Sequence, residues 1–154
     1  MRKIATITTA LMMMLALSTG AAFASQAIDY GTAAGEVIKG TSRADTIHGL
    51  GGNDAIHGLG GNDLLYGGAG IDVIHGGNGD DRAEERKVFG GSGDDTLYGD
   101  AGDDALYGGP GNDTLHSMGD GGADYVDCGA GTDTVKKGSG QSMDRFVNCE
   151  RFVD

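Results

Sequence analysis

The chain repeats itself every nine residues, and this period limits its fold more than any other feature does. Nonapeptides such as GLGGNDAIH and GLGGNDLLY follow one another without a gap over residues 40–84, and again over 90–116 and 119–136. A fixed short period is typical of solenoids, in which each repeat packs mainly on its neighbours. The frame leaves two predicted insertions, residues 85–89 and 117–118.

Three columns of the aligned repeats keep the same residue type through ten units. Position four is Gly in nine of the ten, and position eight is aliphatic, with Ala83 as its smallest member. Position six is always aspartate: Asp45, Asp54, Asp63, Asp72, Asp81, Asp95, Asp104, Asp113, Asp124 and Asp133. Three columns held in phase argue against a disordered, low-complexity chain. Residues 31–39, GTAAGEVIK, fit the frame as an eleventh unit with Glu36 at position six.

Each unit is expected to form a turn followed by a three-residue strand. Its first six residues are rich in Gly, Asn and Asp, which favour turns and tolerate positive φ. In a strand such as 55–57 the side chains alternate, so Ile56 points to one face and its two neighbours point to the other. Two nonapeptides then make one coil of 18 residues, with a thin core formed by position eight of both. The columns therefore predict an all-β parallel solenoid.

Two units, GGAGIDVIH at 67–75 and GGSGDDTLY at 90–98, match every fixed position of the pattern GGxGxDxUx, where U is a large aliphatic residue. The chain closely resembles the RTX, or hemolysin-type, calcium-binding nonapeptide repeat family. The resemblance implies a right-handed parallel β-roll that binds calcium through the aspartates of position six. All ten aspartates are predicted ligands on this basis, with Asp45, Asp124 and Asp133 the weakest members. The resemblance assigns no glycine carbonyl as a ligand.

Carboxylates that stack along one edge of such a roll create the need for a cation. Turns 18 residues apart share an edge at a spacing of about 4.8 Å, so Asp54 is expected beside Asp72 and Asp63 beside Asp81. Two carboxylates at that distance repel each other by roughly 3–4 kcal/mol at an effective dielectric constant near 20. Calcium accepts about six to eight oxygen ligands in irregular geometry. We expect about four to eight calcium ions, the number depending on whether the insertions leave the stack unbroken.

The first 24 residues have the form of a secretory signal peptide. Arg2 and Lys3 precede an apolar stretch that reaches residue 17, and the Ala-Phe-Ala at 22–24 has the small-x-small form of a cleavage site. Secretion is therefore expected, with the periplasm as the alternative compartment and no stable membrane insertion. Loss of Arg2 and Lys3 would change the formal net charge from −12 to −14. This charge argues against nucleic acid as a partner, because phosphate binding needs basic patches.

The chain contains two cysteines, Cys128 in the last unit and Cys149 in the tail. Two cysteines in an exported protein predict one disulfide. The tail leaves the nine-residue register, and its Phe and Val residues are expected to cover the last coil as a cap. The predicted organisation is a signal peptide (1–24), an N-terminal cap (25–39), a calcium-binding roll (40–136) and a C-terminal cap (137–154).

The predicted function is that of a secreted, non-enzymatic calcium-binding protein that folds on binding its ions. No Ser/His/Asp or Cys/His arrangement has a spacing suited to catalysis. RTX toxins and proteases carry the roll behind a catalytic or pore-forming domain, for which this chain has no room, so those activities are not transferred.

An alternative is an extracellular matrix or adhesion module, which would present one face of the calcium-loaded roll to a cell-surface partner. Its contact surface would be the loop 82–89 or the His/Tyr column at position nine. That column also allows a zinc site at His57 and His75, although an ordinary outward strand position explains the two histidines more simply.

Overall fold

The computed structural model describes residues 28–81, 87–117, 122–138 and 143–153. These residues form fourteen short β-strands and no helix, and thus no helix of the length and apolarity that a membrane span requires. The odd-numbered strands form one parallel sheet, the odd sheet: β1 (Ile28–Tyr30), β3 (Thr46–Gly51), β5 (Leu64–Ala69), β7 (Val88–Ser92), β9 (Ala105–Pro110), β11 (Tyr125–Ala130) and β13 (Arg145–Val147). The even-numbered strands form the even sheet: β2 (Val37–Lys39), β4 (Ala55–His57), β6 (Val73–Asn78), β8 (Thr96–Ala101), β10 (Thr114–Ser117), β12 (Thr134–Lys137) and β14 (Arg151–Val153). The predicted signal peptide lies outside the described residues.

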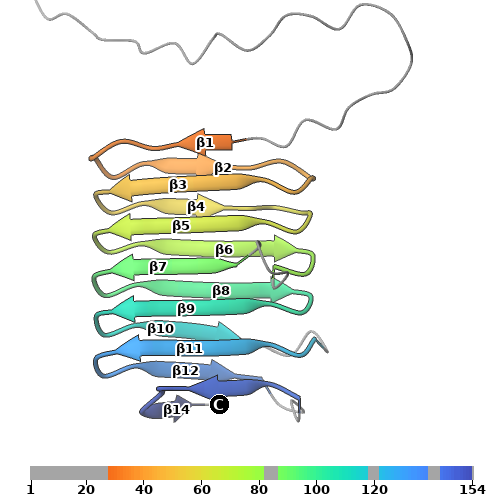
Figure 1. Ribbon diagram of the computed structural model, residues 1–154, viewed down its shortest axis with the longest axis vertical. Helices are drawn as coiled ribbons and strands as arrows, with labels where there is room; N and C mark the ends of the chain where they lie inside the picture. Colours follow the sequence, from red (N-terminus) through yellow and green to blue (C-terminus); the bar gives the residue numbers. More distant parts are fainter. Residues whose placement is uncertain (1–27, 82–86, 118–121, 139–142, 154) are drawn as a thin grey trace, which may run out of the picture.

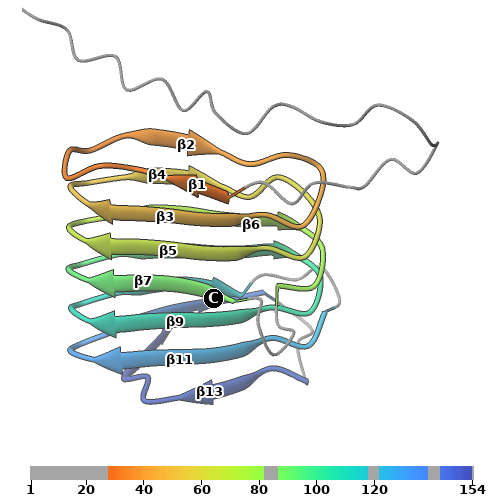
Figure 2. The same ribbon diagram turned by 45° about the horizontal axis from the view of Figure 1, so that its top comes forward.

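Successive strands of each sheet are one coil apart. Ile47 pairs with Leu65 in the odd sheet, and Ile56 pairs with Ile74 in the even sheet, both in parallel. Neighbouring nonapeptides alternate between the two sheets, so that the chain winds as a flattened coil with one sheet on each side (Figures 1 and 2). The predicted all-β parallel β-roll is therefore confirmed.

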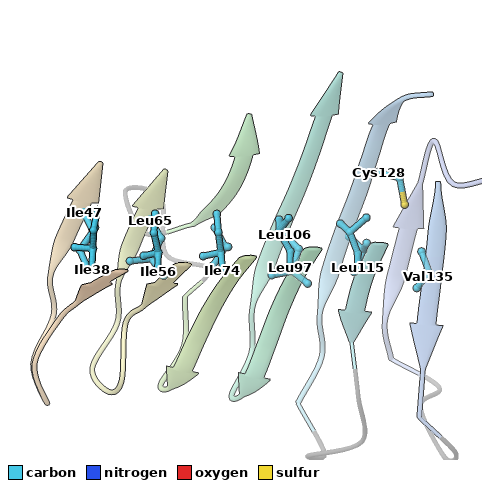
Figure 3. Close-up of a cluster of buried hydrophobic side chains, with 12 residues drawn as sticks. Ile38, Ile47, Ile56, Leu65, Ile74, Leu97, Leu106, Leu115, Cys128 and Val135 are labelled. Atoms are coloured by element: carbon cyan, nitrogen blue, oxygen red, sulfur yellow. The ribbon is translucent and has the colours of Figure 1, made fainter. Parts of the chain in front are cut away.

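A single file of aliphatic side chains fills the space between the sheets (Figure 3). All are at most 7% exposed: Ile38, Ile47, Ile56, Leu65, Ile74, Val88, Leu97, Leu106, Leu115, Val126 and Val135. Full burial of one such side chain contributes about 1.5–3 kcal/mol. Because each coil supplies only two of them, the core is thin and extends along the axis of the roll.

The first insertion lies earlier in the sequence than predicted. Val88 pairs with Leu65 and with Leu106, and its side chain is fully buried in the core. Val88 therefore holds position eight of the fifth unit, which the nine-residue count had given to Ala83. The extra residues are 82–86, which lie outside the described residues, and the predicted insertion at 85–89 is wrong for Lys87, Val88 and Phe89. The physical reason is that Val fills an inward core position better than Ala does.

The second insertion begins later than predicted. Ser117 belongs to β10, pairs with Lys137 and is buried, and its hydroxyl donates a hydrogen bond of 2.8 Å to Asp144 Oδ2. The prediction that residues 117–118 leave the roll is therefore wrong for Ser117. Met118 lies outside the described residues. The two extra residues of this coil fall after Ser117 and before Asp124, because Asp104 still meets Asp124 on the same edge.

Both ends of the chain continue the roll. At the N-terminal end β1 and β2 pair with β3 and β4 at the same offset of 18 residues, so that Ile38 lies beside Ile56. At the C-terminal end β13 and β14 extend the two sheets, and Phe146 packs against the core. Residues 137–154 depart from the 18-residue spacing, since Tyr125 pairs with Arg145 and Thr134 pairs with Arg151, but the strand pairing continues through them.

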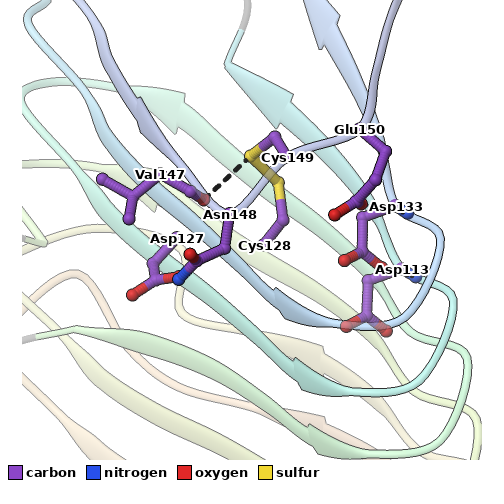
Figure 4. Close-up of a disulfide and its surroundings, with 8 residues drawn as sticks. All are labelled: Asp113, Asp127, Cys128, Asp133, Val147, Asn148, Cys149 and Glu150. Atoms are coloured by element: carbon purple, nitrogen blue, oxygen red, sulfur yellow. Dashed lines mark hydrogen bonds between the residues drawn. A yellow bond between two sulfur atoms is a disulfide. The ribbon is translucent and has the colours of Figure 1, made fainter.

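The predicted disulfide between Cys128 and Cys149 is present. Cys128 is fully buried in β11, and Cys149 lies between β13 and β14, with a Cα–Cα distance of 5.2 Å (Figure 4). The disulfide joins cysteines that are 21 residues apart. On the chain-entropy model, closing a loop of that many residues stabilises the folded protein by about 3 kcal/mol. The bond therefore ties the last coil to the body of the roll.

Candidate metal-binding edges

The six-residue turns collect along two opposite edges of the roll (Figure 1). The odd edge holds the turns that lead into odd strands, and the even edge holds the turns that lead into even strands. The odd edge carries Asp45, Asp63, Asp81, Asp104 and Asp124. The even edge carries Asp54, Asp72, Asp95, Asp113 and Asp133. All ten aspartates are at most 7% exposed.

Along each edge, the carboxylate of an aspartate accepts a hydrogen bond from a backbone N–H of the coil before it. The backbone N–H of Asp54 donates to Asp72 Oδ1 at 2.8 Å, and eight such bonds of 2.5–3.0 Å run along the two edges. They join 45 to 63, 54 to 72, 63 to 81, 72 to 95, 81 to 104, 95 to 113, 104 to 124 and 113 to 133. The structure therefore brings together all the same-edge pairs expected from the sequence, including the four that span an insertion.

The second carboxylate oxygen of most of these residues lacks a donor. Oδ2 is buried without a hydrogen-bond partner in Asp54, Asp72, Asp81, Asp95, Asp113 and Asp133. Leaving a charged oxygen buried without a donor or a counter-ion costs several kcal/mol. The edges are therefore arranged for a positive group that protein donors do not supply.

A backbone carbonyl oxygen lies close to five of these oxygens, the exception being that of Asp133, for which position one is Cys128. A methyl group added at Gly49 would lie 2.5 Å from both Asp54 Oδ2 and Gly67 O. At Gly67 an added methyl would likewise meet Asp72 Oδ2 and Gly90 O. Glycine at position one thus leaves the space into which carboxylate and carbonyl oxygens converge. A set of oxygen ligands alone, held by a flexible backbone, is the set that calcium prefers.

Burial makes these carboxylates poor anions in the absence of a cation. It raises the pKa of Asp81 and of Asp95 to about 7 and the pKa of Asp113 to about 6, and neighbouring carboxylates act in the same direction. The pKa values of Asp72 and Asp133 are also raised, mainly by burial. A divalent cation between two turns would favour the charged forms and offset this cost.

Side chains alone do not complete a metal site in the part of the chain that the structure describes. There, no group of three or more His, Cys, Asp or Glu side chains is placed to hold one ion. The residues nevertheless fit calcium, because buried carboxylate oxygens without a donor and converging backbone carbonyl oxygens are the kind of ligand that it prefers.

Within the described residues, the histidines of position nine do not form a metal-binding group of three or more side chains either. His57 and His75 are stacked as expected, with ring centroids 5.2 Å apart, and His75 Nδ1 lies 3.1 Å from Asp100 Oδ2. The stack continues through Tyr98 to His116.

Three further carboxylates belong to the two rows. The N–H of Glu36 donates to Asp54 Oδ1, the N–H of Asp124 donates to Asp144 Oδ1, and the N–H of Asp133 donates to Glu150 Oε2. The sequence interpretation included Glu36 as an eleventh unit but missed the other two. The signal was present, because the tripeptide Arg-Phe-Val occurs twice in the tail, each time directly after an acidic residue.

Comparison with known protein families agrees with this geometry. The family model of the RTX calcium-binding nonapeptide repeat (four copies) matches residues 30–65, 57–83, 87–115 and 118–135. These segments cover more than half of the chain. The searches of curated proteins and of solved structures gave no match. The repeated turn, the two rows of aspartates and this match together place the chain in the RTX calcium-binding nonapeptide repeat family.

Proposed function

We propose that this protein is a secreted, non-enzymatic calcium-binding protein whose roll folds as calcium enters the two edges. The ten aspartates of position six are the proposed carboxylate ligands, and about four to eight ions would bind between successive turns. The observation that carries the proposal is the row of buried Oδ2 atoms without a donor, five of which converge with a backbone carbonyl oxygen.

Coupled folding follows from the small size of the core. Each coil buries two aliphatic side chains, whereas ordering 18 residues costs about 1–2 kcal/mol per residue in backbone entropy. Hydrogen bonding and calcium binding must offset the remainder. When a ligand binds only the folded state, its binding energy becomes folding energy.

Calcium fits the edges better than magnesium or zinc does. Magnesium requires a strict octahedron and retains its water ligands. Structural zinc sites are built from Cys and His ligands, whereas the two cysteines of this chain form a disulfide.

Circular dichroism of residues 25–154 during a calcium titration tests the proposal. We expect β-structure to appear with calcium and to disappear with a chelator. Asp72→Asn provides the matched test, because Asp72 lies between two partners on the even edge. The variant should lose at least one ion and bind the remainder more weakly. Asp29→Asn removes the same charge from an exposed side chain of β1 and should leave the titration unchanged. A chain equally folded in chelator and in calcium would contradict coupled folding.

Export is proposed from the N-terminal 24 residues and is supported by the disulfide, since disulfides persist in oxidising compartments. N-terminal sequencing of protein recovered outside producing cells should give Ser25 as the first residue. Recovery of an intact Met1 on a cell-associated protein would contradict this part of the proposal.

A second candidate function is a matrix or adhesion module, which the outer surfaces favour. Tyr30, His48, Tyr66, Phe89 and Tyr107 form a continuous ring stack on the odd sheet, with centroids 4.6–5.0 Å apart. Deletion of residues 82–86 would remove the loop and keep Val88 and Phe89 in β7. If this loop is the contact, the deletion should abolish binding to a cell-surface partner while calcium binding persists; unchanged cell binding would exclude the loop.

A further inference from the structure

The first two turns of the roll differ from the later ones at their second position, which is a threonine. In the turn 40–45, Thr41 donates two hydrogen bonds to Asp45 Oδ2, from its N–H at 2.6 Å and from its hydroxyl at 2.9 Å. In the turn 31–36, the N–H of Thr32 donates to Glu36 Oε2 at 2.7 Å and its hydroxyl donates to Oε1 at 2.9 Å. Protein donors therefore already bond to Oδ2 of Asp45 and to both carboxylate oxygens of Glu36.

Later turns have a different backbone at the same position. Leu50 has a φ of 77°, and Gly68 has a φ of 115°. In these two turns Oδ2 of Asp54 and of Asp72 is buried without a donor. Neither threonine is among the residues with positive φ in the described part of the chain. A β-branched side chain strongly disfavours positive φ, so threonine keeps its N–H directed at the carboxylate.

The space for an ion is otherwise retained in the threonine turn. A methyl group added at Gly40 would lie 2.7 Å from both Asp45 Oδ2 and Gly58 O, which is the same arrangement as at Gly49. The oxygens therefore converge in both kinds of turn. The difference is that the two donors of Thr41 already occupy the carboxylate.

We propose that the residue at the second position decides whether a turn of this protein binds calcium, and that threonine there closes the turn to the ion. This inference rests on the proposed function. It leaves seven of the eight same-edge aspartate pairs open, all except that of Asp45 with Asp63. The coil 31–48 then forms a metal-independent start, on which the calcium-dependent coils stack.

Counting bound ions by native mass spectrometry in calcium tests the inference. The variant Thr41→Gly/Arg43→Gly gives the turn 40–45 the glycines of its neighbours and should bind one more ion than the wild type does. Thr41→Ser keeps both donors and should leave the count unchanged. An unchanged count in the double-glycine variant would overturn the inference.

The reciprocal change tests the same rule in a turn that is open. Leu50→Thr should lower the count by one, whereas Leu50→Asn, which tolerates positive φ, should leave it unchanged. Equal counts for these two variants would also overturn the inference. This pair decides the question if the double-glycine variant fails to fold. A wild type that binds no calcium at all would instead refute the proposed function, so the two failures are distinguishable.

Discussion

The convergence of oxygens at position one makes a sharp prediction for alanine substitutions at two glycines of β3. A methyl group at Gly49 would lie 2.5 Å from Asp54 Oδ2 and from Gly67 O, closer than any real contact allows. At Gly51 the nearest atom to an added methyl is Ala69 O at 3.5 Å, which is ordinary contact. Neither glycine has a positive φ, so backbone strain does not enter the comparison.

The two variants should change the free energy of unfolding in opposite directions. Overpacking costs about 1–3 kcal/mol, so Gly49→Ala should destabilise the calcium-loaded protein and should also lose the ion beside Asp54. Gly51→Ala should stabilise the protein by about 0.4–1 kcal/mol, because it restricts the unfolded chain without a clash. With a urea slope of about 2 kcal/mol/M, the two midpoints should lie roughly 0.7–2 M apart.

Urea unfolding followed by circular dichroism, in saturating calcium, gives the midpoints, and native mass spectrometry gives the ion counts. Gly58→Ala and Gly60→Ala repeat the comparison one unit later, because an added methyl would clash with Gly76 O at Gly58 and would find its nearest atom at 3.6 Å at Gly60. Equal midpoints within each pair would refute the reasoning that the oxygens converge at position one.

The remaining predictions concern protons, the disulfide and the core. Burial raises the native pKa of Asp81 and Asp95 to about 7 and of Asp113 to about 6, so their contribution to metal-free stability is present below pH about 4 and lost as the pH rises to about 7. The metal-free roll should therefore be least stable at neutral pH, and circular dichroism in chelator should show more β-structure at pH about 4 than at pH about 7.5; an equal signal at the two pH values would contradict this. Cys128→Ser/Cys149→Ser should cost about 3 kcal/mol, and hydrogen exchange should show faster exchange in β13 and β14 with β3 to β6 unchanged; uniform acceleration would contradict this. Val88→Ala should lower the free energy of unfolding, measured with urea, by about 2 kcal/mol. Val37→Ala removes the same atoms from a side chain that is 69% exposed, and it should change this free energy by less than about 0.5 kcal/mol. Equal losses would show that Val88 is not the core residue of its coil.

The sequence was sufficient for the architecture because each column has one physical task. The aspartate of position six and the aliphatic residue two places later define the turn, the strand and the inward face. Asp54 and Asp72 could therefore be paired from the spacing alone, and the structure joins them by a hydrogen bond of 2.8 Å. The same reasoning predicted the disulfide, because a chain with two cysteines has one pairing available.

The sequence was insufficient where the count and the packing disagree. A count from Gly76 gave position eight to Ala83, whereas pairing with two neighbouring strands selects Val88. The count could not weigh core volume against regular spacing. The same limit hid Asp144 and Glu150, because their turns differ in length from the repeat. The hydrogen bonds of Thr41 to Asp45 were missed because the second position of the repeat is not one of its three fixed columns.

The hydrogen bonds between aspartates of successive coils all run in one direction along the chain. In every hydrogen bond between these aspartates, the donating N–H comes earlier in the chain than the carboxylate that accepts from it. A chain that emerges N-terminus first, from a ribosome or through a translocation channel, therefore always ends in amides whose acceptors have not yet arrived. In the described residues, the last two of these hydrogen bonds are accepted by Asp144 and Glu150, and Glu150 directly follows the disulfide-bonded Cys149. These hydrogen bonds therefore form in order along the chain, and those to Asp144 and Glu150 form only after residues 144–150 have emerged.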